Sequence, residues 1–152
     1  MVALKEHLNS PTIRQAVVDD ACRVLDNQVS GKSGLGGMAV KAAFKVLKGV
    51  KPGFVREVVD ALLDEFMDAL DPLYQAAERN QTTPTAHFSA NSSRVADALL
   101  SVTDRRATES KRPALRAAYE RLRPTAARHV EAAAPAIGGL VERHVRPSGQ
   151  QA

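Results

Sequence analysis

Three lysines, Lys41, Lys45 and Lys48, follow one another at intervals of four and three residues, a spacing that places them on one face of an α-helix. Apolar residues occupy the opposite face, so the segment Gly34 to Lys51 has the pattern of a basic amphipathic helix. Such helices lie on anionic membranes, and Phe44 flanks the lysines, where an exposed aromatic ring would help insertion. We predict that these lysines and Phe44 contact an anionic surface. The alternative is an ordinary helix packed on the protein.

The second half of the chain carries the other basic region. Residues 81–152 contain 11 Lys or Arg against 6 Asp or Glu, whereas residues 1–80 contain 10 against 11. This asymmetry predicts an anionic partner, with a secondary basic patch formed by Arg112, Arg116, Arg121 and Arg128. The arginines of this region are spread around the predicted helix and lack aromatic stacking platforms. Both facts argue against specific nucleic-acid recognition and leave non-specific phosphate binding as the alternative.

An acidic row follows the lysine row along the chain. Its members are Glu57, Asp60, Asp64, Asp68 and Asp71. Both rows point away from the apolar positions of their helices, so they do not easily neutralise each other within one bundle. We interpret them as two solvated faces, or as complementary faces through which two copies form a salt-sensitive homo-oligomer.

Residues that carry enzyme chemistry form no recognisable constellation. Cys22 is the only cysteine, so no internal disulfide is possible, and its place at the edge of an apolar helix face indicates a buried structural thiol. Gly31-Lys32-Ser33 resembles the end of a phosphate-binding P-loop, but Asp26 stands where the pattern requires glycine and a helix precedes it. None of the 4 histidines pairs with a carboxylate at metal-ligand spacing. We therefore expect no enzyme activity, no cofactor and no metal site.

The elements that position these residues are helices. Apolar residues recur at helical spacing and no segment alternates with a period of two, so we predict an all-α fold. It is a single bundle of five or six helices over residues 1–146, with a disordered tail at residues 147–152. Ser10-Pro11 and Asp71-Pro72 each predict a capped helix start. The predicted helices span about 11–29, 35–49, 54–70, 72–79, 91–105 and 113–145. Residues 2–8 are a short helix or frayed arm, and the polar residues 80–89 are the predicted linker.

The last predicted helix contains an eleven-residue repeat. Pro113, Pro124 and Pro135 share this spacing, and so do three glutamates and two sets of apolar residues. Eleven residues make about three turns, so each set keeps to one face, with the prolines opposite the apolar stripe. We predict a long helix kinked at its prolines that either wraps the protein's own core or presents a curved surface to lipid. The pattern resembles that of the exchangeable apolipoproteins. The sequence does not decide whether this helix packs down or swings free.

The first half of the chain is similar to a family of small bacterial proteins. The stretch KSGLGGMAVKAAFKVLKGVKPGFVREVVDALLDEFMDALDP, from Lys32 to Pro72, resembles the signature of an uncharacterised all-helical family. The resemblance implies a helical fold and a bacterial source. It carries no activity and no functional residue to this chain.

Three binding roles are compatible with these patterns. The leading hypothesis is a non-enzymatic protein of the cytoplasm, peripheral to the inner face of the membrane, that contacts lipid or an anionic membrane surface through amphipathic helices. No run approaches the roughly 18 apolar residues that cross a bilayer. The alternatives are a protein-interaction or self-assembling scaffold module, and a carrier of an apolar small molecule inside the bundle. The sequence identifies neither the ligand nor the oligomeric state.

Overall fold

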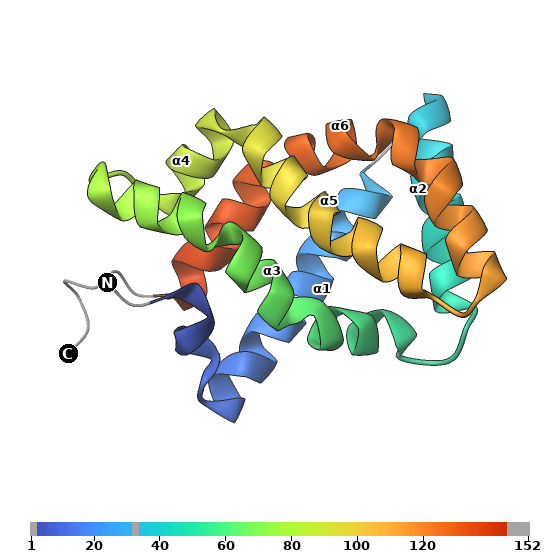
Figure 1. The fold of residues 1–152 in the computed structure, drawn as a ribbon, viewed down its shortest axis with the longest axis horizontal. Helices are drawn as coiled ribbons and strands as arrows, with labels where there is room; N and C mark the ends of the chain where they lie inside the picture. Colours follow the sequence, from blue (N-terminus) through green and yellow to red (C-terminus); the bar gives the residue numbers. More distant parts are fainter. Residues whose placement is uncertain (1–2, 32–33, 146–152) are drawn as a thin grey trace.

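Six α-helices and one short 3₁₀-helix make up the described part of the chain in a computed structural model (Figure 1). The structure describes residues 3–31 and 34–145, and the side chains of residues 34–36 lie outside the description. The elements are η1 (Leu4–Leu8), α1 (Pro11–Ser30), α2 (Gly34–Lys48), α3 (Phe54–Arg79), α4 (Pro84–Ala90), α5 (Ser92–Glu109) and α6 (Pro113–His144). No strand occurs in these residues, which confirms the all-α prediction. The predicted tail, residues 147–152, lies outside the described residues.

Helices α1 and α4 begin with the same two-residue signal, a hydroxyl cap followed by proline. The Ser10 hydroxyl accepts a hydrogen bond from the Ile13 amide at 3.5 Å, as the sequence predicts. The Thr83 hydroxyl accepts one from the Ala86 amide at 3.1 Å, and Pro84 is the first helical residue. The prediction that residues 80–89 form a linker is therefore wrong, because Thr83-Pro84 carries the signal that Ser10-Pro11 carries.

We predict that Thr83→Ala lowers the free energy of unfolding by about 1 kcal/mol, since the amide of Ala86 then loses its cap. Thr83→Ser keeps the hydroxyl and should retain most of the stability. Urea unfolding followed by circular dichroism measures both variants. Equal losses in the two variants would show that the methyl group, and not the cap, matters at this position.

Helix α3 is continuous through Pro72, so the predicted helix start at Asp71-Pro72 is wrong. Pro72 is exposed, while Leu70, Leu73 and Tyr74 on either side of it are buried in the core and anchor both halves of the helix on the bundle. The carboxylate of Asp71 does not cap the helix. It accepts a hydrogen bond from the Leu4 amide at 2.8 Å, and so fixes η1 to α3.

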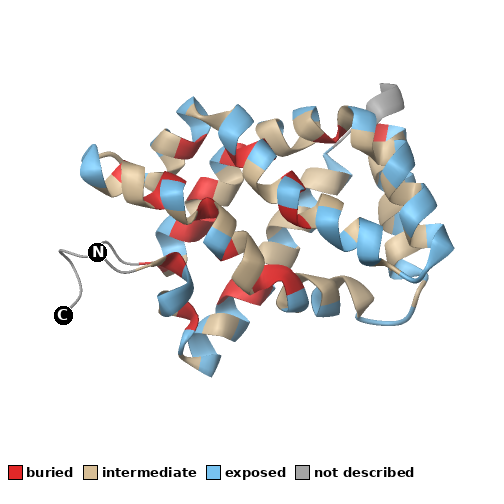
Figure 2. Ribbon diagram, in the orientation of Figure 1, coloured by how far each residue is buried: buried red, intermediate tan, exposed pale blue. Residues whose placement is uncertain are grey.

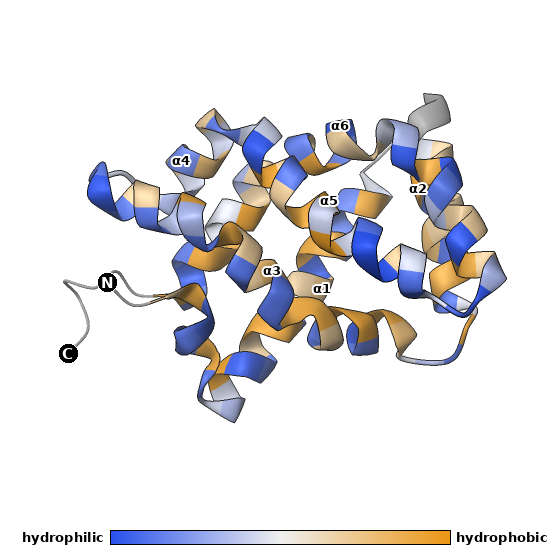
Figure 3. Ribbon diagram, in the orientation of Figure 1, coloured by the Kyte–Doolittle hydropathy of each residue, from blue (hydrophilic) through white to orange (hydrophobic). Residues whose placement is uncertain are grey.

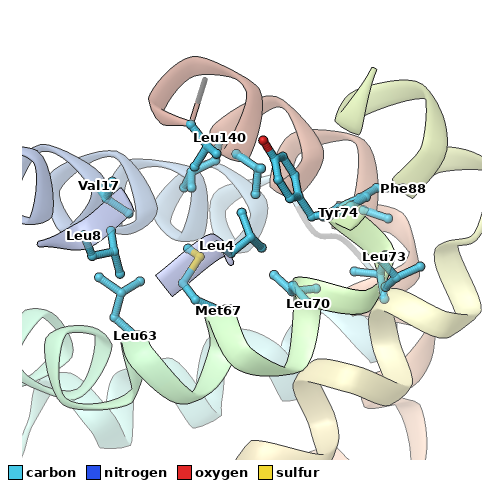
Figure 4. Close-up of a cluster of buried hydrophobic side chains, with 14 of the residues drawn as sticks. Leu4, Leu8, Val17, Leu63, Met67, Leu70, Leu73, Tyr74, Phe88 and Leu140 are labelled. Carbon is cyan, nitrogen blue, oxygen red and sulfur yellow. The ribbon is translucent and has the colours of Figure 1, made fainter. Parts of the chain in front are cut away.

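The main core lies where η1, α1, α3, α4, the early part of α5 and the end of α6 meet. Its largest fully buried side chains are Tyr74, Phe88, Leu4, Val17, Val18, Val95 and Val141. Figure 4 shows Leu4, Met67, Leu70 and Leu140 pointing toward one another from three of these elements. Buried residues concentrate there in Figure 2, whereas the end of the molecule that carries α2 is mostly half-buried or exposed.

Helix α6 runs without interruption from Pro113 to His144 and packs on α5, α4, α2 and α1. In Figure 1 its early part (orange) and its later part (red) point in different directions, as expected of a helix with internal prolines. Pro124 and Pro135 are exposed, while Ala126 and Val141 of the apolar stripe are buried. The helix therefore wraps the core of its own bundle and packs down on it.

Candidate functional site

Helix α2 lies at one end of the molecule, along the early part of α6, and also contacts α1 and α3 (Figure 1). Lys41, Lys45 and Lys48 are all exposed. Among the described residues, no carboxylate lies within ion-pair distance of any of the three. The structure therefore keeps the three lysines on one solvent-facing side of a helix, with no ion pair to any carboxylate in residues 3–31 and 34–145.

The large apolar residue on this face is Met38, to which the sequence patterns gave no role. Its residue surface is 66% exposed, the larger value of the two exposed large hydrophobic residues, Ile13 and Met38. Met38 precedes Lys41 by three residues and Lys45 by seven, so the spacing that revealed the lysines also places Met38 among them. Figure 3 shows hydrophobic and hydrophilic residues side by side along α2.

Phe44 does not stand free as an aromatic anchor. It is half-buried, and the ammonium group of Lys48 lies 4.8 Å from the centre of its ring. A cation at this distance over the ring face is attracted by the π-electrons, so Phe44 helps to orient Lys48. The ring is therefore only partly available to a surface, and its contact with an anionic surface stays a prediction. Met38 takes its place as the exposed apolar side chain.

The four arginines of the secondary patch have different surroundings. The guanidinium of Arg112 lies 5.6 Å from the centre of the Phe54 ring, and so joins the start of α6 to the start of α3. Arg116 donates a hydrogen bond to the Ser110 carbonyl at 3.1 Å. Arg121 and Arg128 are exposed farther along α6. These contacts hold Arg112 and Arg116 on the protein itself and leave the charges spread along the helix.

The acidic row of α3 is bound mainly by the N-terminal part of the chain. Arg14 donates hydrogen bonds to Asp60 and Asp64, each at 3.0 Å. Lys5 pairs with Asp68 at 3.2 Å. These ion pairs anchor η1 and α1 on α3 and neutralise much of the row. The interpretation of the row as a solvated face therefore holds only in part, because basic residues of η1 and α1 pair with it. The sequence did not predict these pairs, since the partners lie far apart along the chain.

A buried carboxylate joins α1 to the last turn of α6. Asp20 is only 3% exposed, and its Oδ2 accepts hydrogen bonds from Arg143 Nε at 2.8 Å and from His144 Nε2 at 2.7 Å. Burial by itself would raise the pKa of Asp20, but these two hydrogen bonds outweigh burial and hold the pKa below its ordinary value. Asp20 is therefore ionised at neutral pH and holds the end of α6 on α1.

A second polar cluster joins α5 to α6. Asp104 accepts hydrogen bonds from the Tyr119 hydroxyl at 2.5 Å and from Arg123 Nε at 2.8 Å. Burial and the neighbouring carboxylate of Asp104 raise the pKa of Tyr119 to about 12, so this phenol keeps its proton. The hydroxyl of Thr103 is 2.7 Å from the same phenol. The cluster is a structural clamp between the two helices.

Neither an activated thiol nor a cluster of metal ligands occurs in the described part of the chain. Cys22 is half-buried, and burial raises the pKa of its thiol, which keeps it protonated and weakly reactive. No three His, Cys, Asp or Glu side chains of the described residues gather in a way that would hold a metal ion. Lys32 and Ser33 of the P-loop-like sequence lie outside the described residues. No described helix combines the length and apolar character that a membrane crossing needs.

Comparison with known families matches residues 4–145 to a family of unknown function (DUF6918). The match covers nearly the whole chain, whereas the resemblance seen in the sequence was confined to its first half. No curated protein and no solved structure matches the chain.

Proposed function

The chain belongs to the family of unknown function DUF6918, and we propose that it is a non-enzymatic protein that binds anionic membrane surfaces through α2. The observation that carries the proposal is the row of exposed lysines, Lys41, Lys45 and Lys48, which have no carboxylate partner among the described residues. Phosphate groups of anionic lipids would supply the missing negative charge.

Six other basic residues of the protein are neutralised by the chain itself, whereas exposed arginines without an ion pair in the described part of the chain, such as Arg79, Arg121 and Arg128, are spread over α3 and α6. Arg14, Arg56, Arg105, Arg106, Arg123 and Arg143 all form ion pairs with carboxylates of the chain. Helix α2 contains no acidic residue, so no charge on the same helix offsets its lysines. Each lysine near an anionic leaflet contributes about 1 kcal/mol, and this attraction falls off within a Debye length.

Met38 adds an apolar side chain to the lysine face. Because 66% of its surface is exposed, most of this residue is available for contact with the lipid interface. Transfer of a fully exposed Met side chain out of water is worth about 1.5–3 kcal/mol, so Met38 supplies roughly half of that range or more. A contact built from lysines and one methionine is reversible and sensitive to salt.

We predict that the protein co-sediments with vesicles of phosphatidylglycerol and phosphatidylcholine at low salt, and much less with phosphatidylcholine alone. Replacing Lys41, Lys45 and Lys48 together by glutamine should weaken binding to the anionic vesicles by about 100-fold, which is the sum of about 1 kcal/mol per lysine. A salt series should reduce binding of the native protein and leave the residual binding of the variant nearly unchanged.

A matched control removes the same charge elsewhere. The variant Arg79→Gln/Arg121→Gln/Arg128→Gln takes three exposed arginines from α3 and α6 and lowers the net charge equally. Its affinity for anionic vesicles should be within a few-fold of that of the native protein. Equal losses in both triple variants would mean that only net charge matters. Absence of any binding to anionic vesicles at low salt would overturn the proposal.

The same proposal includes a location. We propose a bacterial source, as the resemblance of the region from Lys32 to Pro72 implies, and a place on the cytoplasmic face of the membrane. A single cysteine suits a reducing compartment, since no internal disulfide can form. Fractionation of cells that express the tagged chain would test this: recovery with membranes at low salt and release at high salt is the expected result.

A further inference from the structure

Helix α2 is attached to the bundle differently from the other helices. Among its described side chains, residues 37–48, none forms a hydrogen bond or an ion pair with another helix. Side chains do link the other helices. Arg14 joins α1 to α3, Glu65 joins α3 to α5, and Asp104 joins α5 to α6. Glu142 of α6 accepts a hydrogen bond from the Thr85 amide of α4. Packing alone therefore holds the described part of α2 in place.

The apolar contacts of α2 are also shallow. Neither buried cluster of the core, nor the half-buried residues packed against it, includes a described side chain of α2. The inward residues Val40, Ala43 and Leu47 are half-buried and not buried. If α2 moved away, both clusters would remain complete.

The surface that α2 covers would keep its support without it. The early part of α6 is held to α5 by Tyr119 and Arg123, which share the carboxylate of Asp104. Leu122 of the same part packs with Ala126 of α6 and Leu100 of α5. The bundle that remains after removal of α2 is therefore still tied together along α6.

The composition of α2 suits the interface of a bilayer. Its only charged residues are three lysines, and the inward face of its described part consists of Ala, Val and Leu side chains beside the half-buried Phe44. A helix of this kind lies in the plane of a membrane with its apolar face toward the acyl chains and its lysines among the headgroups. Met38 alone gives the outward face little apolar area, whereas the inward face holds five aliphatic side chains, Ala39, Val40, Ala43, Val46 and Leu47.

We propose that, on an anionic membrane, α2 separates from α6 and lies in the interface with its inward apolar face against the lipid, while the rest of the bundle stays folded. This inference rests on the proposed function and specifies which face of α2 meets the acyl chains. The turn after α2 suits such a movement, because Gly53, with φ of 76°, makes the reversal into α3 without side-chain strain.

Single-tryptophan variants test the separation, because the chain contains no Trp. Leu47→Trp places an indole on the inward face, and Met38→Trp places one on the outward face. Vesicles of phosphatidylglycerol with brominated acyl chains quench an indole that enters the hydrocarbon. We expect Leu47→Trp to lose more than half of its emission on these vesicles and Met38→Trp to lose clearly less. Val40→Trp is a second inward position, and circular dichroism without vesicles shows which variants keep the native helix content.

The two proposals fail in different ways. Binding with strong quenching of Met38→Trp and none of Leu47→Trp or Val40→Trp would mean that α2 stays docked on α6. The proposed function would then stand and the separation would be overturned. Failure of every variant and of the native protein to bind the anionic vesicles would overturn both. Quenching of the inward indoles together with complete loss of the helix signal would also overturn the proposed separation, because that proposal requires the rest of the bundle to stay folded.

Discussion

Replacing Arg143 and His144 together by alanine is expected to lower the free energy of unfolding by about 3–5 kcal/mol at neutral pH. The two side chains donate the hydrogen bonds that satisfy the buried carboxylate of Asp20. After their removal, only Arg23 remains nearby, at 3.8 Å and with 67% of its side chain exposed. A charge that stays buried without partners is far more costly than an intact pair. Urea unfolding at pH 7 measures the loss.

The loss should also depend on pH. In the native protein the pKa of Asp20 is held below its ordinary value of 3.8, so its stabilising contribution is present at neutral pH and is lost as the pH falls through that lowered value. In the double variant burial is no longer opposed, so the pKa of Asp20 rises above its ordinary value. Protonation on acidification then relieves the buried charge. The difference between variant and native protein should therefore shrink between pH 7 and about pH 4.

A third substitution separates the buried charge from other effects of the two alanines. Adding Asp20→Leu removes the carboxylate and should restore most of the lost stability, because an apolar side chain at that place needs no partner. A loss that stays the same at pH 7 and pH 4, or one that Asp20→Leu does not repair, would contradict this explanation. It would show that packing of the last turn of α6, not the carboxylate, limits stability.

A cap residue followed by proline occurs at three places in the chain, but it starts a helix at only two of them. Tertiary structure decides which outcome occurs. Ser10-Pro11 and Thr83-Pro84 each start a helix, whereas Asp71-Pro72 lies inside one. Local chemistry is nearly identical in the three cases. Pro72 is tolerated because buried residues on both sides of it anchor α3 in the core, and because the Leu4 amide engages the carboxylate of Asp71. A contact between residues 67 positions apart leaves no sign in the local pattern.

In the candidate site, too, some features follow from the local sequence and others only from tertiary packing. The lysine row depends only on helical spacing, so the sequence predicts it, and the same spacing contains Met38. The partners of the acidic row do not follow from spacing, since Arg14 and Lys5 reach Asp64 and Asp68 only through the packing of α1 and η1 on α3. The orientation of Phe44 likewise depends on how far α2 sinks between its neighbours. Periodicity indicates which residues share a face, and packing determines what that face meets.

Gly138→Ala is expected to lower the free energy of unfolding by about 2 kcal/mol, although alanine normally stabilises a helix. A Cβ atom at Gly138 would lie 2.7 Å from the Pro84 carbonyl oxygen and 2.8 Å from the Cα of Thr85. Both are backbone atoms at the start of α4, where the Thr83 cap and Pro84 fix the chain. The clash can be relieved only by moving α4 away from α6, which loosens the packing of the buried Phe88.

The neighbouring glycine is a natural control, because the same change there meets no backbone atom of α4 and should cost far less. The closest atom to a Cβ at Gly139 is Arg143 Nη1 at 3.3 Å, which belongs to a side chain whose Nε is bound to Asp20, so it must shift by a few tenths of an ångström. The gain in helix propensity, roughly 0.5–1 kcal/mol, is then partly offset by this shift, so Gly139→Ala should change the free energy of unfolding much less than Gly138→Ala does. Thermal and urea unfolding of the two variants test the pair. Stabilisation by both alanines would mean that α4 does not approach α6 closely at Gly138. Equal losses in both would mean that α6 needs glycine for flexibility, and the close approach would not explain either residue.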